Sequence, residues 1–108
     1  MERRADPIYS KLADDPSLGD AVDAFVVSLA ERVDTLQDLD SQANYAELGA
    51  QAAELSLDGT KVGFDSLSRI ADAVVACASE GDRNDTHKAL IELTEIARRI
   101  RLGHRGSV

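Results

Sequence analysis

Residues 15–39 read DPSLGDAVDAFVVSLAERVDTLQDL and contain the longest periodic stretch of the chain. Asp15 is a favoured N-cap residue, and Pro16 after it suits the first position of a helix. The apolar residues that follow, at spacings of 4, 3, 4, 4 and 3, are Leu18, Val22, Phe25, Leu29, Val33 and Leu36. This spacing places them on one face, so the stretch predicts a long helix to about residue 39 with one buried side.

Further helices are predicted on both sides of this one. Asn44, with Glu47 three residues later, is close to a capping box and opens the next helix. The segment 58–63 contains two glycines and an aspartate, which break the pattern, and it is predicted to be a turn. After this turn, Asp65 or Ser66 is predicted to cap a further helix.

The last helix is predicted to begin at Asp82 or Asn84, and the pair Asp6-Pro7 predicts a short leading helix through about Ala13. The predicted buried stripes of the three helices after residue 39 are Tyr45, Leu48, Ala52 and Leu55; Leu67, Ile70, Val74 and Ala78; and Leu90, Leu93, Ala97 and Ile100.

One short helix and four longer ones, joined by short loops, predict an all-α fold, an up-and-down antiparallel four-helix bundle with a short extra N-terminal helix. The composition is typical of packed helices, since aromatic residues make up only 4% of the chain and tryptophan is absent. A length of 108 residues suits one domain. We expect the bundle to cover residues 6–102, with flexible termini at 1–5 and 103–108.

The charge balance limits the partners that the protein can have. Twelve Lys and Arg residues against twenty Asp and Glu residues give a net charge of −8, which disfavours nucleic acid and anionic membrane surfaces. The chain has no apolar run near the roughly 20 residues that cross a bilayer, and its N-terminus lacks the apolar stretch of a secretory signal. The single cysteine, Cys77, is expected to be a small buried hydrophobe. We therefore expect a cytoplasmic protein.

Few residues suit catalysis. The sequence has no glycine-rich phosphate loop, no Cys and His cluster at metal-ligand spacing and no nucleophile elbow. His87, in the first turn of the last predicted helix, and His104, in the tail, are both interpreted as surface residues. We therefore predict that the protein is not an enzyme and holds no metal and no cofactor.

One strip of the helix after Asn44 is less ordinary. Between its buried and charged sides lie Ala46, Gly49, Ala50 and Ala53, which have almost no side-chain bulk. Such a strip allows another protein to approach closely, or it allows tight packing against a neighbouring helix, and the spacing leaves both interpretations open. Gly49 is costly for stability alone, because glycine within a helix costs about 1 kcal/mol relative to alanine.

Three stretches resemble bacterial histidine-phosphotransfer (HPt) domains. They are DPIYSKLADDP at 6–16, FVVSLAERV at 25–33 and VGFDSL at 62–67, the last being similar to the turn that follows the active helix of that family. The resemblance extends over most of residues 6–102 and rests on the order and spacing of the stretches together. It implies a four-helix fold and, as partners, a response-regulator receiver domain or a sensor histidine kinase.

The active helix of that family carries the motif Ala-His-x-Leu-Lys-Gly. An ungapped alignment from the Gly-Phe pair at 63–64 sets residues 52–57, AAELSL, on this motif. The histidine position is then Ala53, the lysine position Ser56 and the glycine position Leu57. A second alignment puts the histidine at Leu55, but it needs a deletion in the turn and places the acceptor on the buried stripe, so we reject it. Neither alignment contains a histidine.

This departure removes the chemistry of the family, because a methyl group cannot attack an aspartyl phosphate as an imidazole does. We therefore expect a pseudo-phosphotransfer protein that binds a receiver domain or sensor kinase without accepting phosphate. The alternatives are a structural or homo-oligomerising bundle and, more remotely, a phosphotransfer protein that uses His87. The predicted partner-binding residues are Ala46, Gly49, Ala50, Ala53, Glu54, Ser56 and Leu57.

Overall fold

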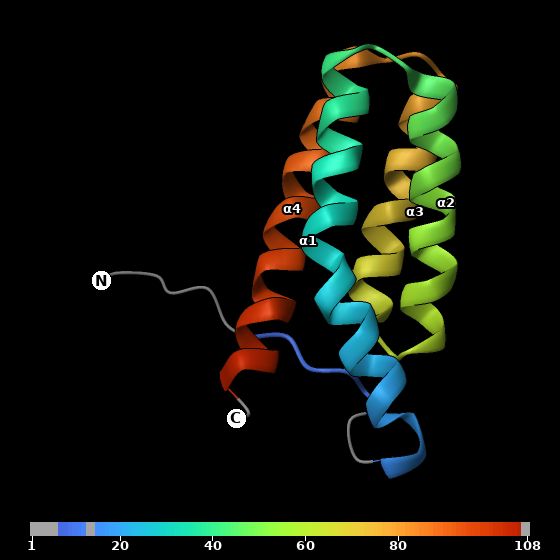
Figure 1. Cartoon of the computed structure of the whole chain (residues 1–108). Helices are drawn as coiled ribbons and strands as arrows, with labels where there is room; N and C mark the ends of the chain where they lie inside the picture. The colour runs from blue at the N-terminus through green and yellow to red at the C-terminus, as the bar shows by residue number, and fades with distance from the viewer. Residues whose placement is uncertain (1–6, 13–14, 107–108) are drawn as a thin grey trace.

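The computed structural model describes residues 7–12 and 15–106, and four helices lie side by side in alternating directions along the chain (Figure 1). The elements are the short 3₁₀ helix η1 (Pro16–Leu18) and the helices α1 (Gly19–Ser41), α2 (Tyr45–Lys61), α3 (Asp65–Ser79) and α4 (Arg83–Gly106). Within the described ranges there is no strand. This arrangement confirms the predicted all-α, up-and-down four-helix bundle.

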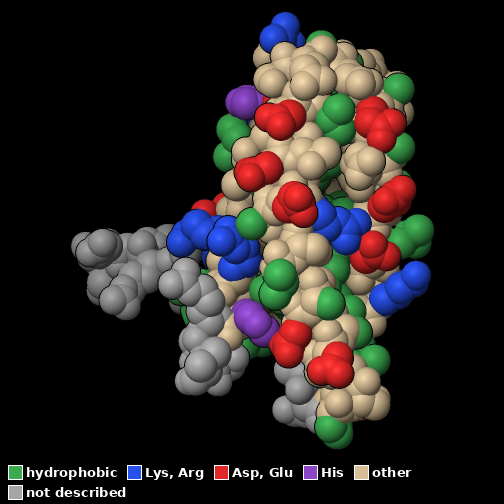
Figure 2. Space-filling model, viewed as in Figure 1, with side chains coloured by type: hydrophobic (Ala, Val, Ile, Leu, Met, Phe, Trp, Pro, Cys, Tyr) green, Lys and Arg blue, Asp and Glu red, His purple; other side chains and the backbone are tan. Residues whose placement is uncertain are grey.

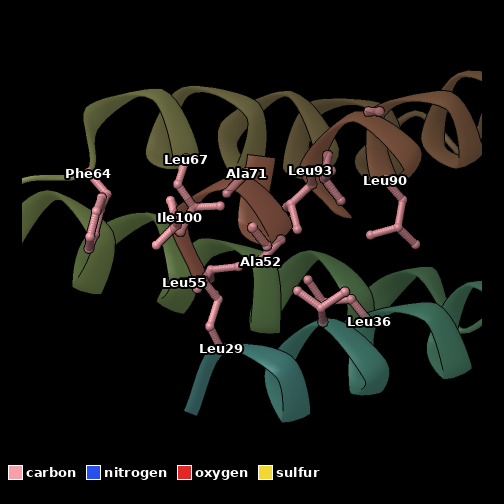
Figure 3. Close-up of a cluster of buried hydrophobic side chains, with 14 of the residues drawn as sticks. Leu29, Leu36, Ala52, Leu55, Phe64, Leu67, Ala71, Leu90, Leu93 and Ile100 are labelled. Carbon is pink, nitrogen blue, oxygen red and sulfur yellow. The ribbon is translucent and has the colours of Figure 1, made fainter. Parts of the chain in front are cut away.

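The core is built from one apolar stripe of each helix. Leu29, Leu48, Leu67 and Leu93 come from the four different helices, and each is 0% exposed. Figure 3 shows such side chains from all four helices converging on a common interior. The predicted stripes are therefore correct over most of their length, and the members that are only partly buried are Leu18, Val22, Tyr45 and Ile70. None of the helices that the structure describes is both long and apolar enough to cross a membrane.

Three predicted caps are present and one is wrong. The Asp15 side chain caps η1 by accepting a hydrogen bond from the backbone N–H of Ser17 (3.0 Å). The Asn44 side chain accepts a hydrogen bond from the backbone N–H of Glu47 (3.3 Å), and Asp82 accepts one from the N–H three residues later (3.0 Å). By contrast, α3 already begins at Asp65, and its N-cap residue, Phe64, makes no side-chain capping bond. The Asp65 carboxylate instead pairs with the Lys11 ammonium at 2.7 Å, a long-range partner that the local sequence cannot indicate.

The predicted turn at 58–63 is also wrong, because α2 continues to Lys61. Gly59 is buried where α2 meets α3, and a Cβ atom there would lie only 2.9 Å from Ser68 Oγ. This glycine therefore permits close contact between two helices instead of breaking one. The chain reverses at Gly63, whose φ of +86° is a conformation that suits glycine.

The predicted leading helix is absent from residues 7–12, which are extended and end in a turn; the predicted ends of that helix, Asp6 and Ala13, lie outside the described residues. The backbone of this segment makes long-range hydrogen bonds. The N–H of Ile8 donates to the carbonyl of Arg99 (3.0 Å), and the N–H of Lys11 donates to that of Gly63 (3.0 Å). The segment thus joins α4 to the α2–α3 turn across one end of the bundle (Figure 1).

The predicted flexible tail at 103–108 is helical as far as Gly106. Gly103 is buried, and a Cβ atom on it would lie 2.8 Å from the carbonyl oxygen of Ile8. Gly103 therefore permits close packing of this last part of α4 against the N-terminal segment. Residues 1–5, 107 and 108 lie outside the described part of the chain.

We predict that Leu29→Ala and Leu48→Ala each lower the free energy of unfolding by about 2–5 kcal/mol, because each leaves a cavity in a closely packed core. Urea denaturation followed by circular dichroism measures this change. Val27→Ala is the control, since Val27 on α1 is 77% exposed and should change stability little. If the two leucine variants unfold at the same urea concentration as this control, the assignment of the core faces is wrong.

Candidate functional site

The outer side of α2 carries a row of small residues that ends in one large apolar side chain. Ala46, Ala50 and Leu57 are exposed and Ala53 is half-buried, at spacings of 4, 3 and 4 that place them on one face. Leu57 is 65% exposed and is the one large apolar side chain of this row. These four residues are called the α2 face below. It is the part of the predicted strip that points away from the core.

Two other predicted partner-binding residues, Ser56 and Gly49, lie on the side of α2 that faces α3. Ser56 is buried, and its hydroxyl donates to Asp72 Oδ1 at 2.6 Å, so it lies inside the bundle and not on the predicted surface. Gly49 is half-buried, and a Cβ atom there would lie 3.9 Å from the Cβ atom of Ala78, which is an ordinary contact. An alanine would fit at position 49, so packing against α3 does not explain the glycine.

The remaining side of α2 is acidic. Glu54, one of the predicted partner-binding residues, is exposed beside the α2 face, as is Glu47, whose carboxylate accepts a hydrogen bond from Gln51 at 2.9 Å. Further round the helix, Asp58 forms an ion pair with Arg32 of α1 at 3.1 Å. Figure 2 shows acidic side chains along α1 and α2 on the side that faces the viewer.

The two alignments to the HPt motif lead to different places. Ala53, the histidine position of the preferred alignment, carries its methyl group on the outer side of α2. Leu55, the histidine position of the rejected alignment, is 1% exposed in the core. A side chain at position 55 could not reach a partner without unfolding of the bundle. The burial of Leu55 thus agrees with the rejection of the second alignment, which would place the phosphate acceptor on the buried stripe.

The structure also brings together two residues, His87 and Asp40, that no sequence pattern connects. His87, near the start of α4, has a 62% exposed side chain, and its Nδ1 lies 2.8 Å from Oδ2 of Asp40 at the end of α1. The Asp40 side chain is only 10% exposed, and its second oxygen, Oδ1, is buried without a hydrogen-bond partner. His87 is therefore a surface residue, as predicted, but a buried carboxylate orients its ring.

His104 and Cys77 are both partly buried. His104 lies within α4, with its Nδ1 3.7 Å from Oδ1 of Asp23, and not in a loose tail. Burial raises the pKa of the Cys77 thiol, and the carboxylates of Asp85, Glu80 and Asp82 raise it further. Cys77 is therefore less buried than predicted, although both effects favour its thiol over the reactive thiolate.

A groove runs between α1 and α4 beside the His87–Asp40 pair, with a volume of about 430 Å³. Its α1 side is formed by Gln37, Asp40 and Ser41, and its α4 side by His87, Leu90, Ile91, Thr94 and Glu95. A hydrogen bond from Gln37 Nε2 to Thr94 Oγ1 (3.0 Å) crosses between the two helices. We call this feature the α1–α4 groove.

Among the residues that the structure describes, no three His, Cys, Asp or Glu side chains cluster closely enough to hold a metal ion. Comparison of the chain with protein-family models, with curated proteins and with solved structures found no match. A functional assignment therefore depends on the geometry of the surfaces described above.

We predict that the same substitution has very different effects on stability at two of the predicted partner-binding positions. Ala50→Arg should change the free energy of unfolding by only a few tenths of a kcal/mol, because position 50 is exposed and arginine is a good helix former. Ser56→Arg should lower it by roughly 2–4 kcal/mol, since a large charged group would replace a small one between α2 and α3. Thermal and urea denaturation of both variants measure the difference; equal stability would mean that Ser56 is not inside the bundle.

Proposed function

We propose that the protein is a pseudo-histidine-phosphotransfer module of a cytoplasmic two-component phosphorelay. In this role it binds a receiver domain or sensor kinase through the α2 face and accepts no phosphate. The observation that carries the proposal is the row along one side of α2 in which Ala46, Ala50 and Leu57 are exposed and Ala53 is half-buried. The resemblance to HPt domains implies that a partner would bind on this side, because the position aligned with the family's histidine is Ala53.

The shape of the α2 face suits a protein partner. From Ala46 to Leu57 it is roughly 16 Å long at the usual helical rise, and alanine side chains let a second backbone come close along that length. Leu57, 65% exposed, offers the single bulky apolar group at one end of this face. The exposed carboxylates of Glu47 and Glu54 would form a charged rim that favours a partner with basic groups at its edge.

The side chains on this face do not support transfer. Ala53 has no nitrogen that could attack a phosphoryl group. Ser56, which stands at the lysine position of the family motif, is buried and uses its hydroxyl on Asp72, so it cannot stabilise a phosphate. A module with this face binds a partner and leaves its phosphate in place, so it acts as an adaptor or competitor in the relay.

The alternative is a structural bundle in which the α2 face packs against a second copy of the chain. The same small residues would serve that contact, and no signalling partner would be needed. The two functions differ in what the face binds, so a single surface variant can separate them if both self-association and receiver binding are measured.

We predict that Ala50→Arg and Ala53→Arg abolish binding to the receiver domain that the native protein captures, while melting temperatures stay close to the native value. The added bulk and charge would disrupt an interface of the standard size of about 1,200–2,000 Å². Pull-down of purified receiver domains from the same organism, followed by calorimetry, measures the loss. Val27→Arg is the matched control, because it places the same side chain at an exposed apolar position of α1.

Three results would contradict this proposal. Unfolding of both α2 variants would mean that the face is internal packing. Retained receiver binding would place the interface elsewhere. A dimer that dissociates only in the α2 variants, with no receiver bound by any form, would favour the structural alternative. Sedimentation equilibrium at several protein concentrations distinguishes the last case.

We also predict that the protein gains no acid-labile phosphate from a phosphorylated receiver domain, because position 53 holds a methyl group. Radiolabelled receiver is the donor, and an HPt domain that carries the histidine is the positive control. Labelling that persists in Ala53→Ser and disappears in His87→Ala would show that His87 is the acceptor, and the pseudo-module proposal would then be wrong.

A further inference from the structure

We propose that the exposed side of α4 is a dimer interface, on which α4 of a second copy of the chain packs antiparallel to the first. In the described part of the chain, α4 contacts α1 and α3 but not α2, which lies across the bundle (Figure 1). The interface therefore does not depend on the function proposed above, and it leaves the α2 face of each copy accessible.

Two large apolar side chains of α4 face solvent. Ile91 is 56% exposed and Leu102 is 40% exposed. Between them, the side chains of Glu95 and Arg98 are 48% and 55% exposed. The four residues follow one another at spacings of 4, 3 and 4, the spacing of a coiled-coil contact, which places them on one side of the helix. These four residues are called the α4 seam below.

The order of the residues in the α4 seam is self-complementary. The midpoint between Ile91 and Leu102 falls between positions 96 and 97, and so does the midpoint between Glu95 and Arg98. A two-fold axis at this point sets Ile91 against Leu102 of the second copy, and Glu95 against Arg98 of the second copy. One exposed aliphatic residue is ordinary, whereas an apolar pair and a charge pair with a shared centre are what a two-fold interface requires.

The charged pair at the centre of the seam is already ordered within one chain. Arg98 donates to the Glu95 carboxylate from Nε at 3.1 Å and from Nη2 at 2.9 Å. This pairing lowers the pKa of Glu95 and keeps its carboxylate ionised. A guanidinium has five N–H donors, so Arg98 retains donors for the carboxylate of a second copy. Two such pairs around a two-fold axis would form a ring of four alternating charges, each with a partner.

The local charge of α4 permits a second copy to approach. The net charge of the chain is −8, so two copies repel each other when acidic faces meet. On the exposed side of α4, however, Lys88, Arg98 and Arg101 stand beside Glu92 and Glu95. Because this side is not acidic, electrostatic repulsion opposes a contact here less than it does along α1 and α2.

The size of the seam sets the strength of the dimer. From Ile91 to Leu102 it is about 16 Å long at the usual helical rise. Ile91 also lines the α1–α4 groove of about 430 Å³, so the leucine of the second copy that meets Ile91 has room to insert beside it. The contact is still short compared with a standard interface of about 1,200–2,000 Å², so we expect a Kd on the order of 100 μM.

Sedimentation equilibrium of the full chain between about 20 μM and about 1 mM measures the self-association. Glu95→Arg and Arg98→Glu each set like charges against each other across the two-fold axis, and each alone should weaken the dimer at least about tenfold. Ile91→Lys tests the apolar pair and should weaken the dimer similarly, which keeps the test valid if a charge variant does not fold. Ala50→Arg is the control, because it adds an arginine on the α2 face and should leave the Kd unchanged.

An equimolar mixture of Glu95→Arg and Arg98→Glu is the decisive sample. In a mixed dimer the new arginine of one variant faces the new glutamate of the other, and the unchanged Arg98 and Glu95 face each other. The pair within each chain stays broken, so a restored dimer reports only on the contact between copies. We expect the mixture to form a species of twice the 11.6 kDa chain mass, although each variant alone is largely monomeric.

Several outcomes would overturn the proposal. A native chain that stays monomeric at about 1 mM has no such interface. Single variants that dimerise as tightly as the native chain, or a mixture of folded variants that stays monomeric, would exclude the charge pairing between copies. A dimer that only Ala50→Arg dissociates would belong to the α2 face. Receiver binding is measured separately by calorimetry, so either proposal can fail while the other stands.

Discussion

The close contact between α2 and α3 determines which side of α2 the protein presents to solvent. Ser68 Oγ donates to the carbonyl of Ser56 at 2.7 Å, and Thr60 Oγ1 donates to Ser68 Oγ at 2.9 Å. Gly59 permits this approach, because any larger residue would meet Ser68. These polar contacts fix the rotation of α2, while Leu48 and its neighbours bury the adjacent side. The small residues from Ala46 to Leu57 are left facing outward as a consequence.

Helical periodicity predicted the parts of the fold that depend on it. The stripes that contain Leu29, Leu48 and Leu93 were read correctly because a 3.6-residue repeat and a single shared core leave one arrangement for each helix. The prediction for the N-terminal segment is wrong because the structure of this segment depends on distant contacts and not on a local repeat. Its hydrogen bonds go to Arg99 and Gly63, far along the chain, and helix-start signals near Pro7 carry no information about partners so distant.

The distinction between local patterns and long-range contacts also applies to the candidate sites. The outward position of Ala46, Ala50 and Ala53 follows from their spacing relative to Leu48, and the sequence was enough to predict it. The burial of Ser56 was not predictable, because it depends on where Asp72 of α3 lies. Nor was the Asp40–His87 pair, whose members are 47 residues apart and meet only because α1 ends where α4 begins. Local patterns reveal faces of single helices, whereas pairs between helices require the packed structure.

Under the proposed function, position 53 would explain how a bundle could lose transfer chemistry and keep its architecture. The side chain there lies outside the core that Leu29, Leu48 and Leu93 form, so its identity contributes little to the stability of the fold. A change from imidazole to methyl at such a position removes a nucleophile and shortens the side chain, but it leaves the backbone and the surrounding alanines in place. A partner that recognised the shape of this helix would still find it. The fold and the proposed docking surface would thus be separable from the reaction, and this separation is the physical basis of the pseudo-module proposal.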